Sequence, residues 1–170
     1  MSDVALIREL RAAGSAATSP VPGPTGRRLA RVGWIDPVEQ GQFLAMERAF
    51  ESTGGVASGD EIAQRLRGHS DQPISAVARW IVDREVVSFR WRSKILLPLF
   101  QFEGSSMTLR PGMAEVILEL SAALDDWELA AWFAQPSAWL DGAAPVDTIS
   151  HDPHAVLQAA RADRFIALGS

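Results

Sequence analysis

Apolar residues recur at helical spacing through most of this chain, so a mainly helical fold is expected. The clearest stripe lies in residues 113–124, where five apolar residues follow the i, i+3, i+4, i+7, i+11 spacing of a helix with one buried face. These residues are Met113, Val116, Ile117, Leu120 and Leu124. A similar stripe in residues 2–13 predicts a short amphipathic helix, and the proline-rich residues 14–26 are typical of a linker.

The middle of the chain predicts two short helices joined by a tight turn. Before these two helices, Asp36-Pro37 has the signature of an N-cap followed by proline, which predicts the start of another helix. Ser58 and Glu61 have the spacing of a capping box, which predicts a short helix ending near Gly68. In the next helix four apolar residues are expected to face inward: Ile74, Val77, Ala78 and Ile81. This arrangement predicts a helix-turn-helix.

A strict alternation of apolar and polar residues follows over residues 87–92 and predicts a strand. A turn is expected at Ser93-Lys94, and a second strand from Ile95 to Phe102. Such a β-hairpin directly after a helix-turn-helix is expected to form a wing. The segment from Ile74 to Phe102 resembles the small winged-helix DNA readers of excisionases and the MerR group. The resemblance rests on Arg79-Trp80-Ile81 and on the segment from Leu97 to Phe102.

Five cations lie in or beside this segment, and we predict them to contact DNA: Arg79, Arg84, Arg90, Arg92 and Lys94. Arginine suits bidentate contacts to guanine edges, whereas lysine acts as a point charge on phosphate. The excess of positive charge is small, so a solvated reader that has lost DNA binding is the alternative.

A third pattern spans residues 132–157 and predicts helix, loop, helix. Pro136 disfavours helical geometry at Gln135, so the first helix should end there. Gly142 is free to adopt a positive φ in the loop. Asp152-Pro153 then predicts the start of the last helix.

Residues 111–165 resemble the toxin-binding domain of Xre–MbcA–ParS-type antitoxins. The matching positions are Trp132, Pro136, Leu140, Gly142, Pro145, Asp147, Val156, Leu157, Ala160 and Arg161. The chain departs from the family pattern at Asp141, where a Gly-Gly pair is usual, and at Thr148-Ile149, where a Leu-Leu pair is usual.

The resemblance implies a partner toxin, and RES-type enzymes that consume NAD are among the toxins paired with this family. It also implies that the C-terminal end, residues 161–170, reaches into the toxin and blocks its active site. The predicted toxin-binding residues are Trp132, Pro136, Trp139, Leu140, Gly142, Pro145, Arg161 and Arg164. Trp139 is expected either to anchor the interface or to fold back over Trp132.

Composition and charge add few constraints. The 170 residues are 47% apolar and contain no cysteine, which favours a folded, cytoplasmic protein without disulfides. No apolar run reaches the length of about 20 residues that spans a membrane. Residues 60–110 have net charge +2 and residues 111–170 net charge −7, which indicates two surfaces with different partners.

No constellation of catalytic residues is evident, so the protein is not expected to be an enzyme or to bind a cofactor. His151 and His154 lack further ligands at a supporting spacing, so no metal site is predicted. Asp125, Asp126 and Glu128 have the spacing of helix-start residues, which explains them without paired-acid hydrolysis.

These observations predict three segments: an N-terminal helix and linker (1–35), a winged helix-turn-helix DNA reader (36–105) and a helical toxin-binding module (106–170). The expected function is that of an antitoxin that neutralises its toxin sterically, is a homo-oligomer and also binds operator DNA. The main alternative is a DNA-binding transcription regulator without a toxin, whose C-terminal helices serve for dimerisation. A third alternative is an interaction module that has lost both partners.

Overall fold

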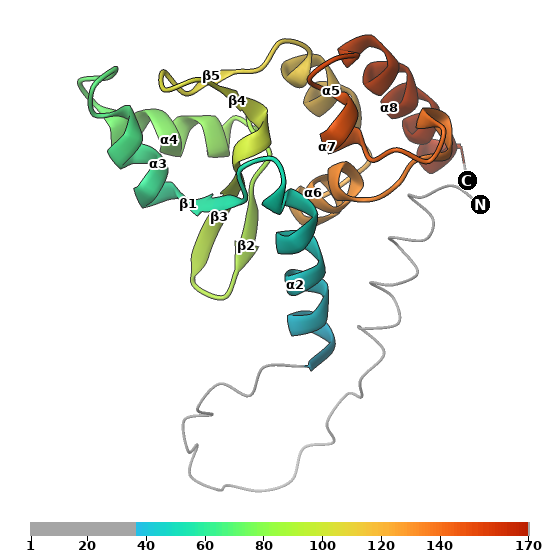
Figure 1. Ribbon diagram of the computed structural model, residues 1–170, viewed down its shortest axis with the longest axis horizontal. Coiled ribbons are helices and arrows are strands. Elements are labelled where there is room, and N and C mark those ends of the chain that lie inside the picture. The colour runs from blue at the N-terminus through green and yellow to red at the C-terminus, as the bar shows by residue number, and fades with distance from the viewer. Residues whose placement is uncertain (1–36, 170) are drawn as a thin grey trace, which may run out of the picture.

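A computed structural model of the protein describes residues 37–169; the predicted N-terminal helix and linker lie outside these residues. The helices are α2 (Pro37–Glu51), α3 (Gly59–Leu66), α4 (Pro73–Val82), α5 (Met113–Leu120), α6 (Asp126–Ala134), α7 (Pro145–Thr148) and α8 (Pro153–Leu168). The strands are β1 (Val56–Ser58), β2 (Phe89–Trp91), β3 (Lys94–Pro98), β4 (Phe102–Glu103) and β5 (Thr108–Leu109), and two 3-10 turns are η1 (Leu99–Gln101) and η2 (Ala138–Leu140). The prediction of a mainly helical chain is confirmed. Figure 1 shows α3 and α4 on one side of the molecule, α5 to α8 on the other, and the sheet and α2 between them.

The helix α2 begins, and the helix α3 begins and ends, where the sequence predicts. Met46 and Phe50 are the buried residues of α2. The turn that follows this helix in the chain ends at Gly54 and Gly55, which have φ of +107° and +77°. The Ser58 hydroxyl accepts from the Glu61 N–H at 3.3 Å, and the Ser58 N–H donates to Glu61 Oε2 at 2.7 Å, so the capping box is confirmed. Hydrogen bonds from Ser58 are the main reason that the pKa of Glu61 is lowered.

The predicted inward face of α4 is partly wrong. Val77 is buried and Ile81 half-buried, but Ile74 is 71% exposed and Ala78 is exposed as well. The helix packs through Val77 and Trp80, whose ring lies 5.9 Å from that of Phe102. This contact turns the row that contains Ile74 and Ala78 toward solvent.

Three antiparallel strands form the main sheet in the order β1-β3-β2. Phe89 of β2 pairs with Leu96 of β3, and Val56 of β1 pairs with Pro98. The predicted hairpin is present, but its turn is at Arg92-Ser93, one residue earlier than expected, with Arg92 at φ +55°. The second strand is shorter than predicted because η1 begins after Pro98, and β1 was not predicted at all.

The buried side chain of Gln101 joins η1 to the approach of β2. Its Oε1 accepts from the Val87 N–H at 2.7 Å, and its Nε2 donates to the Val87 and Pro98 carbonyls at 2.8 and 2.9 Å. Gln101 is 0% exposed, so these bonds satisfy polar groups that water does not reach.

The buried apolar residues form two clusters. The smaller one lies under α3 and α4, and the larger one joins α2, β2 and α5 to α8. Leu96 of β3 belongs to the larger cluster and the adjacent Leu97 to the smaller, so this strand separates the two cores. The larger cluster takes residues from both sides of position 105, and the domain boundary there remains a prediction.

The C-terminal helices begin at the predicted caps. Asp125 accepts from the Glu128 N–H at 2.9 Å at the start of α6, and Asp152 accepts from the Ala155 N–H at 2.9 Å at the start of α8. The helix α6 ends at Ala134, before Pro136, as expected. Gly112 precedes α5 with φ +84° and lies against Pro153, which fixes the starts of α5 and α8 beside each other.

Candidate partner-binding site

The loop after α6 is closed by its own hydrogen bonds. The Ser137 N–H donates to the Ala143 carbonyl at 2.9 Å, and the Gly142 N–H donates to the Ser137 carbonyl at 2.9 Å. Asp141 and Gly142 reverse the chain with φ of +54° and +84°. The loop therefore holds η2, and Trp139 within it, in a defined position.

Asp163 of α8 ties this loop to the last helix. It is 0% exposed, and its Oδ2 accepts from the Trp132 indole N–H at 2.8 Å while its Oδ1 accepts from the Trp139 indole N–H at 3.0 Å. Trp132 is buried, whereas Trp139 is 54% exposed. One carboxylate thus orients a core tryptophan and a surface tryptophan, so Trp139 is held by its N–H while much of the side chain remains at the surface.

The outer face of α8 is formed by Arg161, Arg164, Phe165 and Leu168, which follow the i, i+3, i+4, i+7 spacing. Phe165 is 80% exposed and Leu168 is 56% exposed. With Glu119 of α5 and Gly169, this face lines a surface hollow of about 430 Å³. An exposed aromatic ring and two arginines beside a hollow are features of protein-binding surfaces.

Glu119 holds both arginines of this face in place. Arg164 Nη1 donates to Glu119 Oε1 at 2.6 Å, and Arg161 Nε lies 3.8 Å from Oε2. Glu119 is only 20% exposed, whereas the two arginines are about half exposed. The ion pairs are weak as a source of stability at this exposure, but they orient the guanidinium groups over the hollow.

The structure brings together some of the predicted toxin-binding residues and buries others. Trp132 (2% exposed), Leu140 (8% exposed) and Pro145 fill the core between α6, α7 and α8, so they support the site from within and do not present a surface. Pro136 and Gly142 are exposed in the loop.

The expected C-terminal plug, residues 161–170, stays a prediction, and the structure describes its form as far as Gly169. The segment is the second half of α8 as far as Leu168, and Asp163 pins it to the loop. The sequence analysis missed Glu119 and Asp163. Asp163 could have been found, because it continues the buried stripe of Val156, Ala159 and Ala160 at helical spacing.

The predicted DNA contacts separate into two groups. Arg79 on α4 and Arg90, Arg92 and Lys94 on the hairpin are exposed. Arg84 is different, because its guanidinium bonds to groups of the same chain and is not a free cation on the surface.

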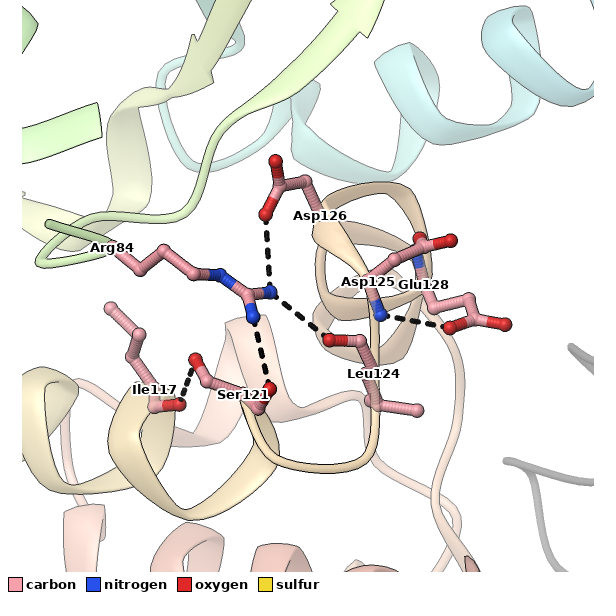
Figure 2. Close-up of polar contacts among 7 residues, drawn as sticks. All are labelled: Arg84, Ile117, Ser121, Leu124, Asp125, Asp126 and Glu128. Carbon is pink, nitrogen blue, oxygen red and sulfur yellow. Dashed lines mark hydrogen bonds and ion pairs between the residues drawn. The ribbon is translucent and has the colours of Figure 1, made fainter. Parts of the chain in front are cut away.

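Arg84 joins the end of α4 to the turn between α5 and α6 (Figure 2). Its Nη1 donates to the Ser121 carbonyl at 2.9 Å, and its Nη2 donates to the Leu124 carbonyl at 3.0 Å and lies 3.1 Å from Asp126 Oδ1. Ser121 is the C-cap of α5, where helical partners for carbonyls are missing, and Leu124 directly precedes Asp125, the N-cap of α6. Arg84 itself is held at φ +53°.

Arg84→Ala is expected to lower the free energy of unfolding by about 2 kcal/mol, because it removes charged hydrogen bonds to two carbonyls in a partly buried site. Arg84→Gly removes the same bonds but relieves the left-handed backbone, so its cost should be smaller by about 1 kcal/mol. Urea unfolding followed by circular dichroism measures both values. Equal losses of unfolding free energy in the two variants would contradict backbone strain at Arg84. No loss in either variant would contradict a stabilising role for its hydrogen bonds.

The described residues offer little for other kinds of site. Between Pro37 and Gly169 no three His, Asp or Glu side chains gather as metal ligands would. None of the helices in this range combines the length and apolarity needed to span a membrane.

Comparisons with protein-family models, curated proteins and solved structures gave no match to this chain.

Proposed function

We propose that this protein is an antitoxin-like binding protein that neutralises a partner toxin by covering it with its C-terminal half. The observation that carries the proposal is the outer face of α8, where the Phe165 side chain is 80% exposed beside a hollow and two oriented arginines. The resemblance of residues 111–165 to toxin-binding domains agrees with this location. It also favours a toxin of the RES type, an enzyme that consumes NAD.

The proposed mode of binding is a docked helix face. Residues 161–168 are helical and Asp163 is buried, so they would meet the toxin as a surface that is already formed. A preformed surface loses little conformational entropy on binding. Trp139, held by Asp163 and 54% exposed, would add a second anchor on the other side of α8. Inhibition would be steric, with Arg161 and Arg164 available to a phosphate-binding pocket.

Capture of the protein encoded by the adjacent reading frame, which the proposal expects to be the toxin, tests the proposal. Phe165→Asp should weaken binding at least about tenfold, because it removes an exposed aromatic anchor and places a charge in the interface. The matched control is Val82→Asp, since Val82 is similarly exposed (77%) but lies at the end of α4. Point substitutions are preferable to deletion of residues 161–170, which would also remove Asp163.

Binding and toxin inhibition should both fall in Phe165→Asp and persist in Val82→Asp, with thermal melting showing that both variants are folded. Undiminished inhibition by a folded Phe165→Asp variant would contradict the docking site. Failure of the unmodified chain to bind the neighbouring protein would contradict the proposed function itself.

A second candidate function is DNA binding by a winged helix-turn-helix. The order α2-β1-α3-α4-β2-β3, with the strands arranged β1-β3-β2, favours this candidate because it is the order in which a winged helix-turn-helix is built. The exposed cations on α4 and the hairpin agree with it. A mobility shift of the protein's own promoter, weakening steeply with salt, would support a regulator, either alone or together with toxin binding.

A further inference from the structure

The outward face of α4 carries little positive charge. Its exposed row is Ile74, Ala78 and Val82, with Ile74 71% and Val82 77% exposed, and Arg79 is its one cation. Two exposed acids, Asp83 and Glu85, follow directly after the helix. An apolar ridge that ends in carboxylates is poorly suited to lie against DNA phosphates.

The tip of the β2–β3 hairpin has the opposite character. Residues 90–94 contain Arg90, Arg92 and Lys94, all exposed, and no acid. Within residues 37–169 none of these three cations forms an ion pair. Figure 1 shows the hairpin extending away from α3 and α4, and the acidic C-terminal helices lie on another side of the sheet.

The hairpin tip is also rigidly supported. Trp91 stacks on Phe43 of α2 with ring centroids 4.4 Å apart and planes 3° from parallel. The Arg92 guanidinium lies over the same indole, 5.7 Å from the ring centroid. Arg92 also occupies a left-handed position at φ +55°, where glycine or asparagine would be less strained.

We propose that the hairpin tip, residues 90–94, and not α4, holds duplex DNA by its phosphate backbone. The inference rests on the second candidate function and names the surface that performs it. A duplex is favoured over a single strand because Trp91 is already covered by Phe43 and Arg92, and single strands are held largely by stacking bases on free aromatic faces. The net charge of −7 in residues 111–170 would turn the rest of the molecule away from the DNA.

Fluorescence anisotropy with a labelled mixed-sequence duplex, over a series of salt concentrations, tests the inference on the full chain. The variant Arg90→Ala/Arg92→Gly should bind at least about tenfold more weakly and should lower the slope of log K against log salt by about 2, because each phosphate contact contributes about 0.9. Arg79→Ala is the matched control on α4 and should change the affinity less than about twofold.

Arg92→Gly removes the charge and the backbone strain together, so a folded hairpin is expected and thermal melting checks it. A larger loss with Arg79→Ala than with the hairpin variant would overturn the inference and leave DNA binding to α4. Equal or tighter binding of a single strand of the same sequence would overturn it too. Absence of mixed-sequence duplex binding by the unmodified chain would overturn the inference, and the mobility shift with the protein's own promoter decides separately on the second candidate function.

Discussion

Asp163→Ala is expected to lower the free energy of unfolding by about 3 kcal/mol, because it leaves the buried Trp132 indole N–H without its acceptor and opens a cavity in the core. Asp163 accepts from two indoles at 2.8 and 3.0 Å and is 0% exposed, so water cannot replace it without entering the core. Urea unfolding measures the loss.

The matched control for this substitution is Asp147→Ala on α7, an exposed acid, which should change stability by less than about 0.5 kcal/mol. Asp163→Asn keeps the shape of the side chain but has a single acceptor oxygen. It should therefore lower the free energy of unfolding by about half as much as Asp163→Ala. Since Asp163 also orients Trp139, the asparagine variant should weaken toxin capture even while folded. A stability loss in Asp163→Ala no larger than in Asp147→Ala would contradict this account.

Gly112→Ala is expected to cost about 3 kcal/mol, from a left-handed backbone and from overpacking together. A Cβ at this position would lie 2.6 Å from Pro153 Cβ, and Gly112 has φ +84°. Pro153 begins α8, so the clash would push apart the two helices that frame the hollow. Thermal or urea unfolding measures the cost.

Gly142→Ala is the control, because Gly142 has the same φ of +84° but nothing within 4 Å of an added Cβ. Gly142→Ala should lower the free energy of unfolding only by the cost of a left-handed backbone at alanine, about 1 kcal/mol. The difference between the two variants then isolates the contact with Pro153. If both cost the same, the contact at Gly112 is relieved by a small shift of α8 and contributes nothing.

Local signals in the sequence predicted the helix boundaries well. Each of these signals involves residues at most four positions apart, so a short stretch of sequence encodes its geometry. They are the capping box at Ser58, the caps at Asp125 and Asp152, and the helix end before Pro136. The strand β1 was not predicted, because three residues carry too short a pattern and the strand exists only through its pairing with β3.

The candidate site was harder to predict because it depends on contacts between distant segments. Arg84 looked like a free cation, yet its partners lie 37 and 40 residues later in the chain. Trp132 and Trp139 were both predicted as toxin contacts, but only Trp139 reaches the surface. Tertiary packing decided which residues of a matching motif are presented and which are buried.

The position of β3 between two cores has a consequence for strand alignment. In a sheet with one buried and one solvent-exposed face, a slip by one residue would expose apolar side chains to water. The free-energy cost of that exposure selects the correct pairing. Leu96 and Leu97 are both buried, so hydrophobicity discriminates poorly between alternative alignments of this strand. The Gln101 amide, which bonds both backbone groups of Val87 and the Pro98 carbonyl, can reach them in one alignment only. A single polar side chain therefore supplies the specificity that the apolar residues around it lack.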